Sequence, residues 1–140
     1  MIHALTGALV SVTAHQIVLQ CGHFEFEITV SAQTASHLSQ IPQDKRREVR
    51  IVTFLQHRED SMLLFGFMND QERAVFEQLQ TVPGIGAKQA LKILGGMSLK
   101  NLLMALDGGD VKTLSQIPGV GSKTAQRLIL ALRNTLVLEE

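Results

Sequence analysis

Two short stretches with the same glycine spacing carry the clearest chemistry in this sequence. Residues 81–88 read TVPGIGAK, and residues 116–123, 35 positions later, read QIPGVGSK. Each stretch follows one helical pattern and precedes another, so its glycines lead into a helix N-terminus. Unpaired amide hydrogens and the positive end of the helix dipole attract anions there, and glycine lets another molecule's backbone approach closely. The repetition favours two sites for a phosphate backbone.

Each stretch ends in a lysine, Lys88 or Lys123, in the first turn of the following helix. A cation alone is mildly unfavourable at that position, so finding it twice suggests that a phosphate completes the site. Arg127 lies one turn beyond Lys123 on the same helix face and can reach the same backbone. The alternative is two tight corners whose glycines serve only the turn, which a single copy would favour. Neither stretch matches a Walker loop or the dinucleotide fingerprint.

The Pro-Gly-x-Gly pattern resembles the helix-hairpin-helix motif, which binds the DNA backbone without reading base sequence. Apolar residues flank the glycines in both copies, and we expect them to pin each hairpin to its own helices. These residues are Val82, Ile85, Ile117 and Val120.

Composition limits the classes of protein. The 140 residues suffice for one domain or two small ones, and the 45% apolar content is typical of a globular protein. Thirteen basic and thirteen acidic residues cancel, which argues against a highly charged DNA-coating protein. The single cysteine, Cys21, excludes a disulfide framework and a cysteine zinc site. Without a leader pattern or a long apolar run, a cytoplasmic protein is expected, with no metal, cofactor or membrane partner.

The first half of the chain reads mostly as β-strands. Strands are predicted at 2–12, 15–21, 23–30, 49–57 and 61–67, with a helix at 31–41 that ends before Pro42. Five strands with a helix after the third predict a small barrel of the OB type. The phenylalanines of these strands are expected to lie in the core rather than to stack on bases. They are Phe24, Phe26, Phe54, Phe65 and Phe67.

From Asn69 onward the apolar period becomes helical, so the fold class is α+β, with domains at 1–67 and 68–140. Asn69 with Glu72 has the spacing of a capping box, and Ser98 and Asp110 are expected to cap two later helices. The last helix is predicted to start at Ser122 and to run to about residue 137.

Several stretches together resemble the RuvA family, the Holliday-junction-binding subunits of a bacterial branch-migration machine. They are the opening MIHALTG at 1–7, REDSMLLFGF at 58–67, QER at 71–73 and the two hairpins, in the family's order and spacing. The resemblance covers residues 1 to about 135. The segment CGHFEF at 21–26 departs from the family's glycine-rich pattern, so this barrel corner is expected to differ in shape.

The resemblance implies site residues. The expected DNA-binding residues are Gly84, Gly86, Lys88, Gly119, Gly121, Lys123 and Arg127. Glu59 and Asp60 form the predicted tip of a strand hairpin, where acidic residues are common for local hydrogen-bonding reasons. In the resembling family this tip is an acidic pin that repels duplex arms from the crossover.

The resemblance also implies partners. They are four-way junction DNA, a homotetramer that can pair as an octamer, the hexameric AAA+ motor RuvB and the resolvase RuvC. The family's C-terminal motor-binding domain is absent from these 140 residues, so we expect junction binding without motor-driven branch migration. A non-catalytic subunit is expected. The alternatives are a fragment of a DNA repair enzyme that uses such hairpins for non-specific binding, and a protein-interaction module.

Overall fold

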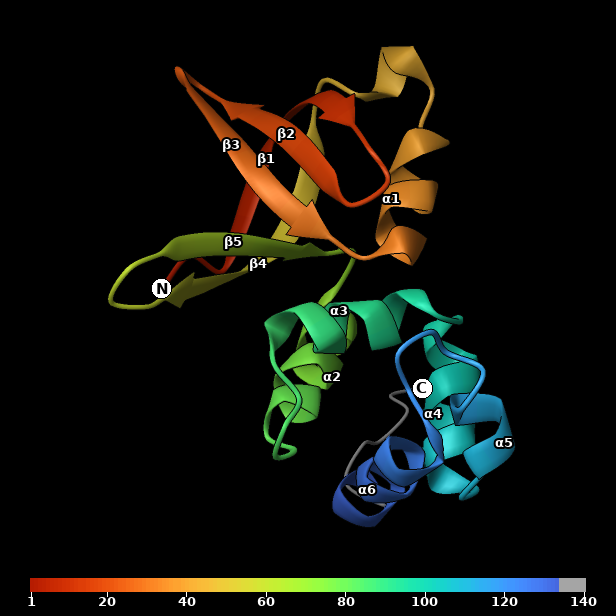
Figure 1. Ribbon diagram of the computed structural model, residues 1–140. Helices are drawn as coiled ribbons and strands as arrows, with labels where there is room; N and C mark the ends of the chain where they lie inside the picture. The colour runs from red at the N-terminus through yellow and green to blue at the C-terminus, as the bar shows by residue number, and fades with distance from the viewer. Residues whose placement is uncertain (134–140) are drawn as a thin grey trace. The chain divides into compact units, whose positions relative to one another are not determined.

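The computed structural model describes residues 1–133, which form two compact units (Figure 1). The first unit is Met1–Arg73 and the second starts at Ala74. Helix α2 (Asp70–Gln80) therefore begins in the first unit and continues in the second. Among residues 1–133, no helix is long and apolar enough to cross a membrane.

The first unit is a closed five-stranded barrel, as the sequence predicted. The strands follow the expected ranges closely: β1 (Ala4–Val12), β2 (Gln16–Cys21), β3 (Phe24–Val30), β4 (Val49–His57) and β5 (Met62–Phe67). Their order around the barrel is β1-β2-β3-β5-β4, and β1 pairs with β4 to close it. Only β3 and β5 are parallel among the paired strands of the described chain. This is the OB-type barrel that five strands and an intervening helix indicated.

Alternation along β3 places side chains inside the barrel only toward its C-terminal end. Ile28 and Val30 are fully buried, whereas Phe24 is 70% exposed and Phe26 is half-buried. Strand β5 pairs with β3 only at Thr29 and Val30, so the N-terminal end of β3, which carries Phe24, has no β5 neighbour. The prediction of core phenylalanines is thus right for the buried Phe65 and Phe67 and wrong for Phe24.

Helix α1 (Ala32–Ser39) adds to the core of this barrel. Ser31 caps its N-terminus, with the hydroxyl accepting a 3.1 Å hydrogen bond from the Thr34 amide. Ala35 and Leu38 are buried in the same apolar cluster as the strand residues Ile17 and Leu19. A short 3-10 turn, η1 (Gln43–Lys45), then leads to β4.

The first turn of α2 is tied to the barrel unit by polar contacts. The Asn69 side chain caps the helix by accepting from the Glu72 amide at 2.9 Å, as predicted. The Glu72 carboxylate does not return to the Asn69 amide, which corrects the second half of the capping box. It accepts from the Met68 amide at 3.2 Å and from the Thr34 hydroxyl at 2.7 Å. The tertiary contact with α1 therefore replaces a local one.

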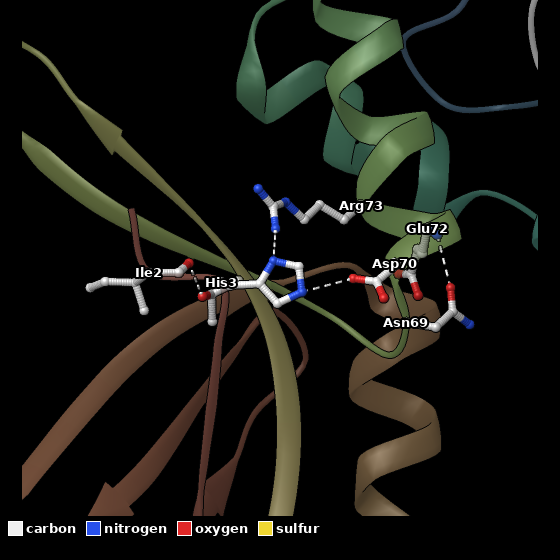
Figure 2. Close-up of polar contacts among 7 residues, drawn as sticks. Ile2, His3, Asn69, Asp70, Glu72 and Arg73 are labelled. Atoms are coloured by element: carbon white, nitrogen blue, oxygen red, sulfur yellow. Dashed lines mark hydrogen bonds and ion pairs between the residues drawn. The ribbon is translucent and has the colours of Figure 1, made fainter.

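His3 adds a second link at the same turn. Figure 2 shows its ring between two residues of α2, with Nε2 3.2 Å from an Asp70 oxygen and Nδ1 2.9 Å from an Arg73 nitrogen. The backbone next to it is anchored as well, because the Thr53 hydroxyl donates to the Ile2 carbonyl at 2.6 Å. The start of the chain and the start of α2 are thus joined within one unit.

The second unit contains the remaining helices, α3 (Ala87–Gly95), α4 (Leu99–Asp107), α5 (Val111–Leu114) and α6 (Ser122–Leu132). Ser98 caps α4 and Asp110 caps α5, each by accepting from the amide three residues later. Helix α5 ends at Leu114. The predicted end of the last helix, near residue 137, lies outside the described residues.

Candidate nucleic-acid interface

The two hairpins have the same backbone geometry. Gly84 and Gly119 take positive φ values of 88° and 85°, a conformation that glycine adopts without strain. The turn that contains each of these glycines is closed by a 3.0 Å bond, from the Ile85 amide to the Val82 carbonyl and from the Val120 amide to the Ile117 carbonyl. The sequence repeat is therefore also a structural repeat.

Buried apolar side chains fix each hairpin to the helices around it. The four flanking residues expected to do so are at most 6% exposed. They are Val82, Ile85, Ile117 and Val120. Gly96, just after α3, lets the second hairpin pack closely, because an added Cβ there would lie 2.8 Å from an Ile117 side-chain carbon. The hairpin backbones are thus held by the helical core.

Packing inside the protein does not require a glycine at the second glycine position of each hairpin. Gly86 and Gly121 have φ near −90° and extended ψ, which any residue can adopt. A Cβ added to either would meet nothing within 4 Å. Both are the N-cap residues of α3 and α6, and neither helix has a side-chain cap bond. Each helix therefore starts with amides that no cap covers, behind a glycine that leaves space for an outside molecule.

Exposed cations follow these glycines. Lys88 and Lys123 are each the second residue of their helix, and both are exposed. The repeat also relates Lys92 to Arg127, so each helix carries a second exposed cation one turn further on. The sequence already showed this pair, because Lys88 and Lys92 have the same i, i+4 spacing as Lys123 and Arg127. The sequence prediction named Lys88 but left out Lys92.

Local charge favours an anionic partner here, although the whole chain is neutral. Residues 81–133 contain seven basic and two acidic residues, a formal charge of +5. The balancing acidic residues lie elsewhere in the sequence, so the neutral total conceals a basic segment.

Arg127 does more than the sequence suggested. Its guanidinium donates a 3.0 Å hydrogen bond to the Pro83 carbonyl of the first hairpin. Gln89 on α3 reaches the opposite way, donating to the Gly119 carbonyl at 3.3 Å. Neither link follows from local patterns, since the paired residues are 44 and 30 positions apart. A guanidinium has five N–H donors, so Arg127 can hold Pro83 and still offer donors to a phosphate.

Glu59 and Asp60 lie in the turn between β4 and β5, as expected. Both are exposed, and the turn is closed by a 2.8 Å bond from the Arg58 amide to the Ser61 carbonyl. Met62 and Leu63, which begin β5, are also exposed at 62% and 42%. The tip of this strand hairpin is therefore acidic, with apolar side chains next to it.

Cys21 is the free thiol of the described residues, and it is half-buried at the end of β2. Burial raises the pKa of this thiol, so less thiolate is present at neutral pH. This agrees with a packing residue rather than a nucleophile.

A closed OB-type barrel followed by paired hairpins defines a class of two-module proteins. Residues 76–134 match the family described as "SAM-like Helix-hairpin-helix tandem", and residues 1–66 match "RuvA N terminal domain". The chain belongs to the RuvA family, because relatives named for that family match at least 97% of it at 42–45% identity.

Curated relatives agree with that assignment along the whole chain. A Treponema pallidum (strain Nichols) protein is 42% identical over 140 residues, 100% of this chain and 60% of the relative. A Treponema denticola protein is 43% identical over 136 residues, 97% and 66% of the two chains. A Neisseria gonorrhoeae protein is 45% identical over 137 residues, which are 98% of this chain and 69% of the relative. All three are named Holliday junction branch migration complex subunit RuvA. This chain spans about 60% of the length of the Treponema pallidum relative.

Proposed function

We propose that this chain binds four-way (Holliday) junction DNA through its phosphate backbone, as a subunit of a branch migration complex in recombination and repair. The observation that carries the proposal is the repeated hairpin. Each copy ends at a helix without a side-chain cap, behind a glycine whose missing Cβ would meet nothing inside the protein. The name shared by the relatives supplies the type of DNA.

Backbone contacts explain binding without base readout. Amides at the starts of α3 and α6 suit phosphate oxygens, and Lys88 and Lys123 add charge at the same ends. Lys92 and Arg127 extend each contact by one helical turn. In this proposal, Gly84, Gly86, Gly119 and Gly121 allow the DNA backbone to come close.

The acidic tip supplies preference for a junction in this proposal. Carboxylates repel phosphates, so Glu59 and Asp60 disfavour a continuous duplex passing over them. At a crossover the strands separate, and the tip can occupy the space between them. Junction shape, rather than base sequence, is then selected.

We also propose that the protein is the non-catalytic member of its complex and acts in the cytoplasm as a homotetramer. The 140 residues contain no Walker loop for ATP. A separate motor, RuvB by family resemblance, would supply ATP hydrolysis, and the resolvase RuvC would act on the same junction. Mass measurement by light scattering, with and without junction DNA, tests the tetramer and its pairing as an octamer.

A gel-shift competition tests the proposal directly. A labelled four-way junction is bound by the protein and challenged with unlabelled junction or with linear duplexes of the same arm sequences, at several salt concentrations. We expect the junction to compete much better, affinity to fall steeply with salt, and changes of base sequence to have little effect.

Other outcomes identify the alternatives. Equal competition by linear duplex would favour a general DNA-binding module, such as part of a repair enzyme. No binding at low salt would favour a protein-interaction module. Affinity that followed base sequence and ignored salt would contradict the phosphate contacts.

A further inference from the structure

Side chains connect the two hairpins to each other. The Gln89 side chain starts on α3, the helix after the first hairpin, and donates to the Gly119 carbonyl in the second. Arg127 starts on α6, the helix after the second hairpin, and donates to the Pro83 carbonyl in the first. Each hairpin is therefore held by the helix that belongs to the other.

This reciprocity is not a product of the repeat. The repeat relates Gln89 to Thr124 and Arg127 to Lys92, so the two links use different residue types at non-equivalent positions. A repeated sequence would have produced identical links if the pattern alone were responsible. Two unlike side chains instead achieve the same result, which points to a requirement on the position of the hairpins.

Close packing supports the Arg127 link. A Cβ added to Gly84 would lie 3.0 Å from an Arg127 guanidinium nitrogen, whereas one added to Gly119 would meet nothing within 4 Å. A glycine at position 84 therefore has two roles. It adopts the positive φ that the turn needs, and it leaves room for the Arg127 guanidinium beside the hairpin. A larger residue there would press on the guanidinium.

Two anion sites act together on one strand only if their separation and orientation are maintained. Groups that are ordered before binding avoid the entropy loss of ordering them in the complex. A hydrogen bond between the sites provides that order even though it contacts no ligand.

We propose that Gln89 and Arg127 form an inter-hairpin clamp that sets the spacing at which both hairpins contact one DNA backbone. The inference rests on the proposed function, because the spacing matters for binding only if both hairpins contact DNA. Gln89 is a positioning residue that contacts no phosphate. Arg127 has two roles, since it closes the clamp and carries charge toward the backbone.

A distance measurement tests the clamp without DNA. Spin labels are placed at Thr81→Cys and Gln116→Cys, exposed repeat-related positions, in a Cys21→Ser background. Labelled protein is diluted with unlabelled protein so that distances within one chain dominate. Gln89→Met keeps the side-chain length and removes the N–H donor, so we expect a broader distance distribution. Gln78→Met, at an exposed glutamine of α2, is the matched control and should leave the distribution unchanged.

Junction binding separates positioning from phosphate contact. Gln89→Met should weaken junction binding about three- to tenfold, the range expected for one lost hydrogen bond. The slope of log affinity against log salt should stay the same, because no cation is removed, whereas Lys123→Ala should lower that slope by about 1. Gln89→Met and the Gln78→Met control should both be fully folded at the temperature of the binding assay, so that weaker binding reflects the position of the hairpins.

Three results would overturn the clamp: an unchanged distance distribution, unchanged junction affinity, or a salt slope that falls as for Lys123→Ala. The last would make Gln89 a direct DNA contact. If the unmodified protein fails to bind any junction, the proposed function fails. A broadened distribution would then still show the clamp, without the purpose assigned to it.

Discussion

Lys88 and Lys123 place charge at two helix ends that already favour anions. Each lies in the first turn of a helix whose glycine N-cap makes no side-chain cap bond, so the lysine charge and the uncapped amides lie at the same helix end. Both lysines are exposed, so they are not part of the packed core. Their removal should therefore affect binding rather than folding.

We therefore expect Lys88→Ala with Lys123→Ala to weaken junction binding and to lower the salt slope by about 2, one for each lost phosphate contact. Lys100→Ala with Lys112→Ala, two exposed lysines on α4 and α5, removes the same charge and is the control. Gel shifts across a salt series measure both. A lowered melting temperature with unchanged binding would show that the lysines are structural.

At the acidic tip, removing charge should have the opposite effect on DNA affinity. Glu59→Gln with Asp60→Asn removes charge that repels phosphate, so binding to linear duplex should tighten and the preference for a junction should narrow. Glu25→Gln with Glu27→Gln, on exposed residues of β3, gives the same change of charge away from the tip. Competition between junction and duplex measures the preference. A clear loss of duplex affinity would contradict a repulsive role.

At the scale of the element, glycines in this chain serve two different purposes. Gly66 in β5 is required by packing, because an added Cβ would lie 2.5 Å from an Ile28 methyl carbon. At Gly86 and Gly121 the same methyl group would point into open space. Only the first kind should matter for stability.

Gly86→Ala with Gly121→Ala should weaken junction binding while leaving the free energy of unfolding within about 1 kcal/mol, since a poorer N-cap is offset by a less flexible unfolded chain. Gly66→Ala should instead destabilise the protein by about 1–3 kcal/mol through overpacking. Urea unfolding and gel shifts distinguish the two. Full junction affinity in the double variant would mean that DNA does not approach these glycines closely.

At the scale of the whole molecule, a buried carboxylate connects folding to pH. Glu72 lies in the first turn of α2, is 9% exposed, and accepts a hydrogen bond from Thr34 of α1. Burial raises its pKa above the ordinary value of 4.5, although bonds from Thr34 and Met68 and the charge of His37 act the other way. The folded state therefore favours the protonated form.

This sign gives a stability prediction. The Glu72 contribution to the free energy of unfolding is fully present below pH 4.5 and is lost as pH rises through the raised pKa. Glu72→Gln can still accept from Met68 and donate to Thr34, and it does not ionise. Its stability relative to the unmodified protein should increase with pH above 4.5. Urea unfolding from pH 4 to pH 8 measures this, with Glu77→Gln, exposed on α2, as control. A constant difference would mean that folding does not raise the pKa of Glu72.

The elements and the hairpins could be predicted from the sequence, because both depend on local rules. Strand alternation, the Asn69 and Ser98 caps, and the Pro-Gly-x-Gly turns involve residues a few positions apart. Those rules predicted the barrel, the helices and the exposed Lys88 and Lys123. The repeat made the hairpin prediction strong, because one local rule was satisfied twice.

Contacts between residues far apart in the sequence could not be predicted and came from the fold itself. The Glu72 carboxylate accepts from the Thr34 hydroxyl, 38 positions away, so the capping box was predicted with the wrong donor to that carboxylate. Phe24 continues an inward-facing pattern but is exposed, because β5 covers only the far end of β3. The Gln89 and Arg127 links cross 30 and 44 positions. Such contacts depend on how the elements pack, which no local spacing encodes.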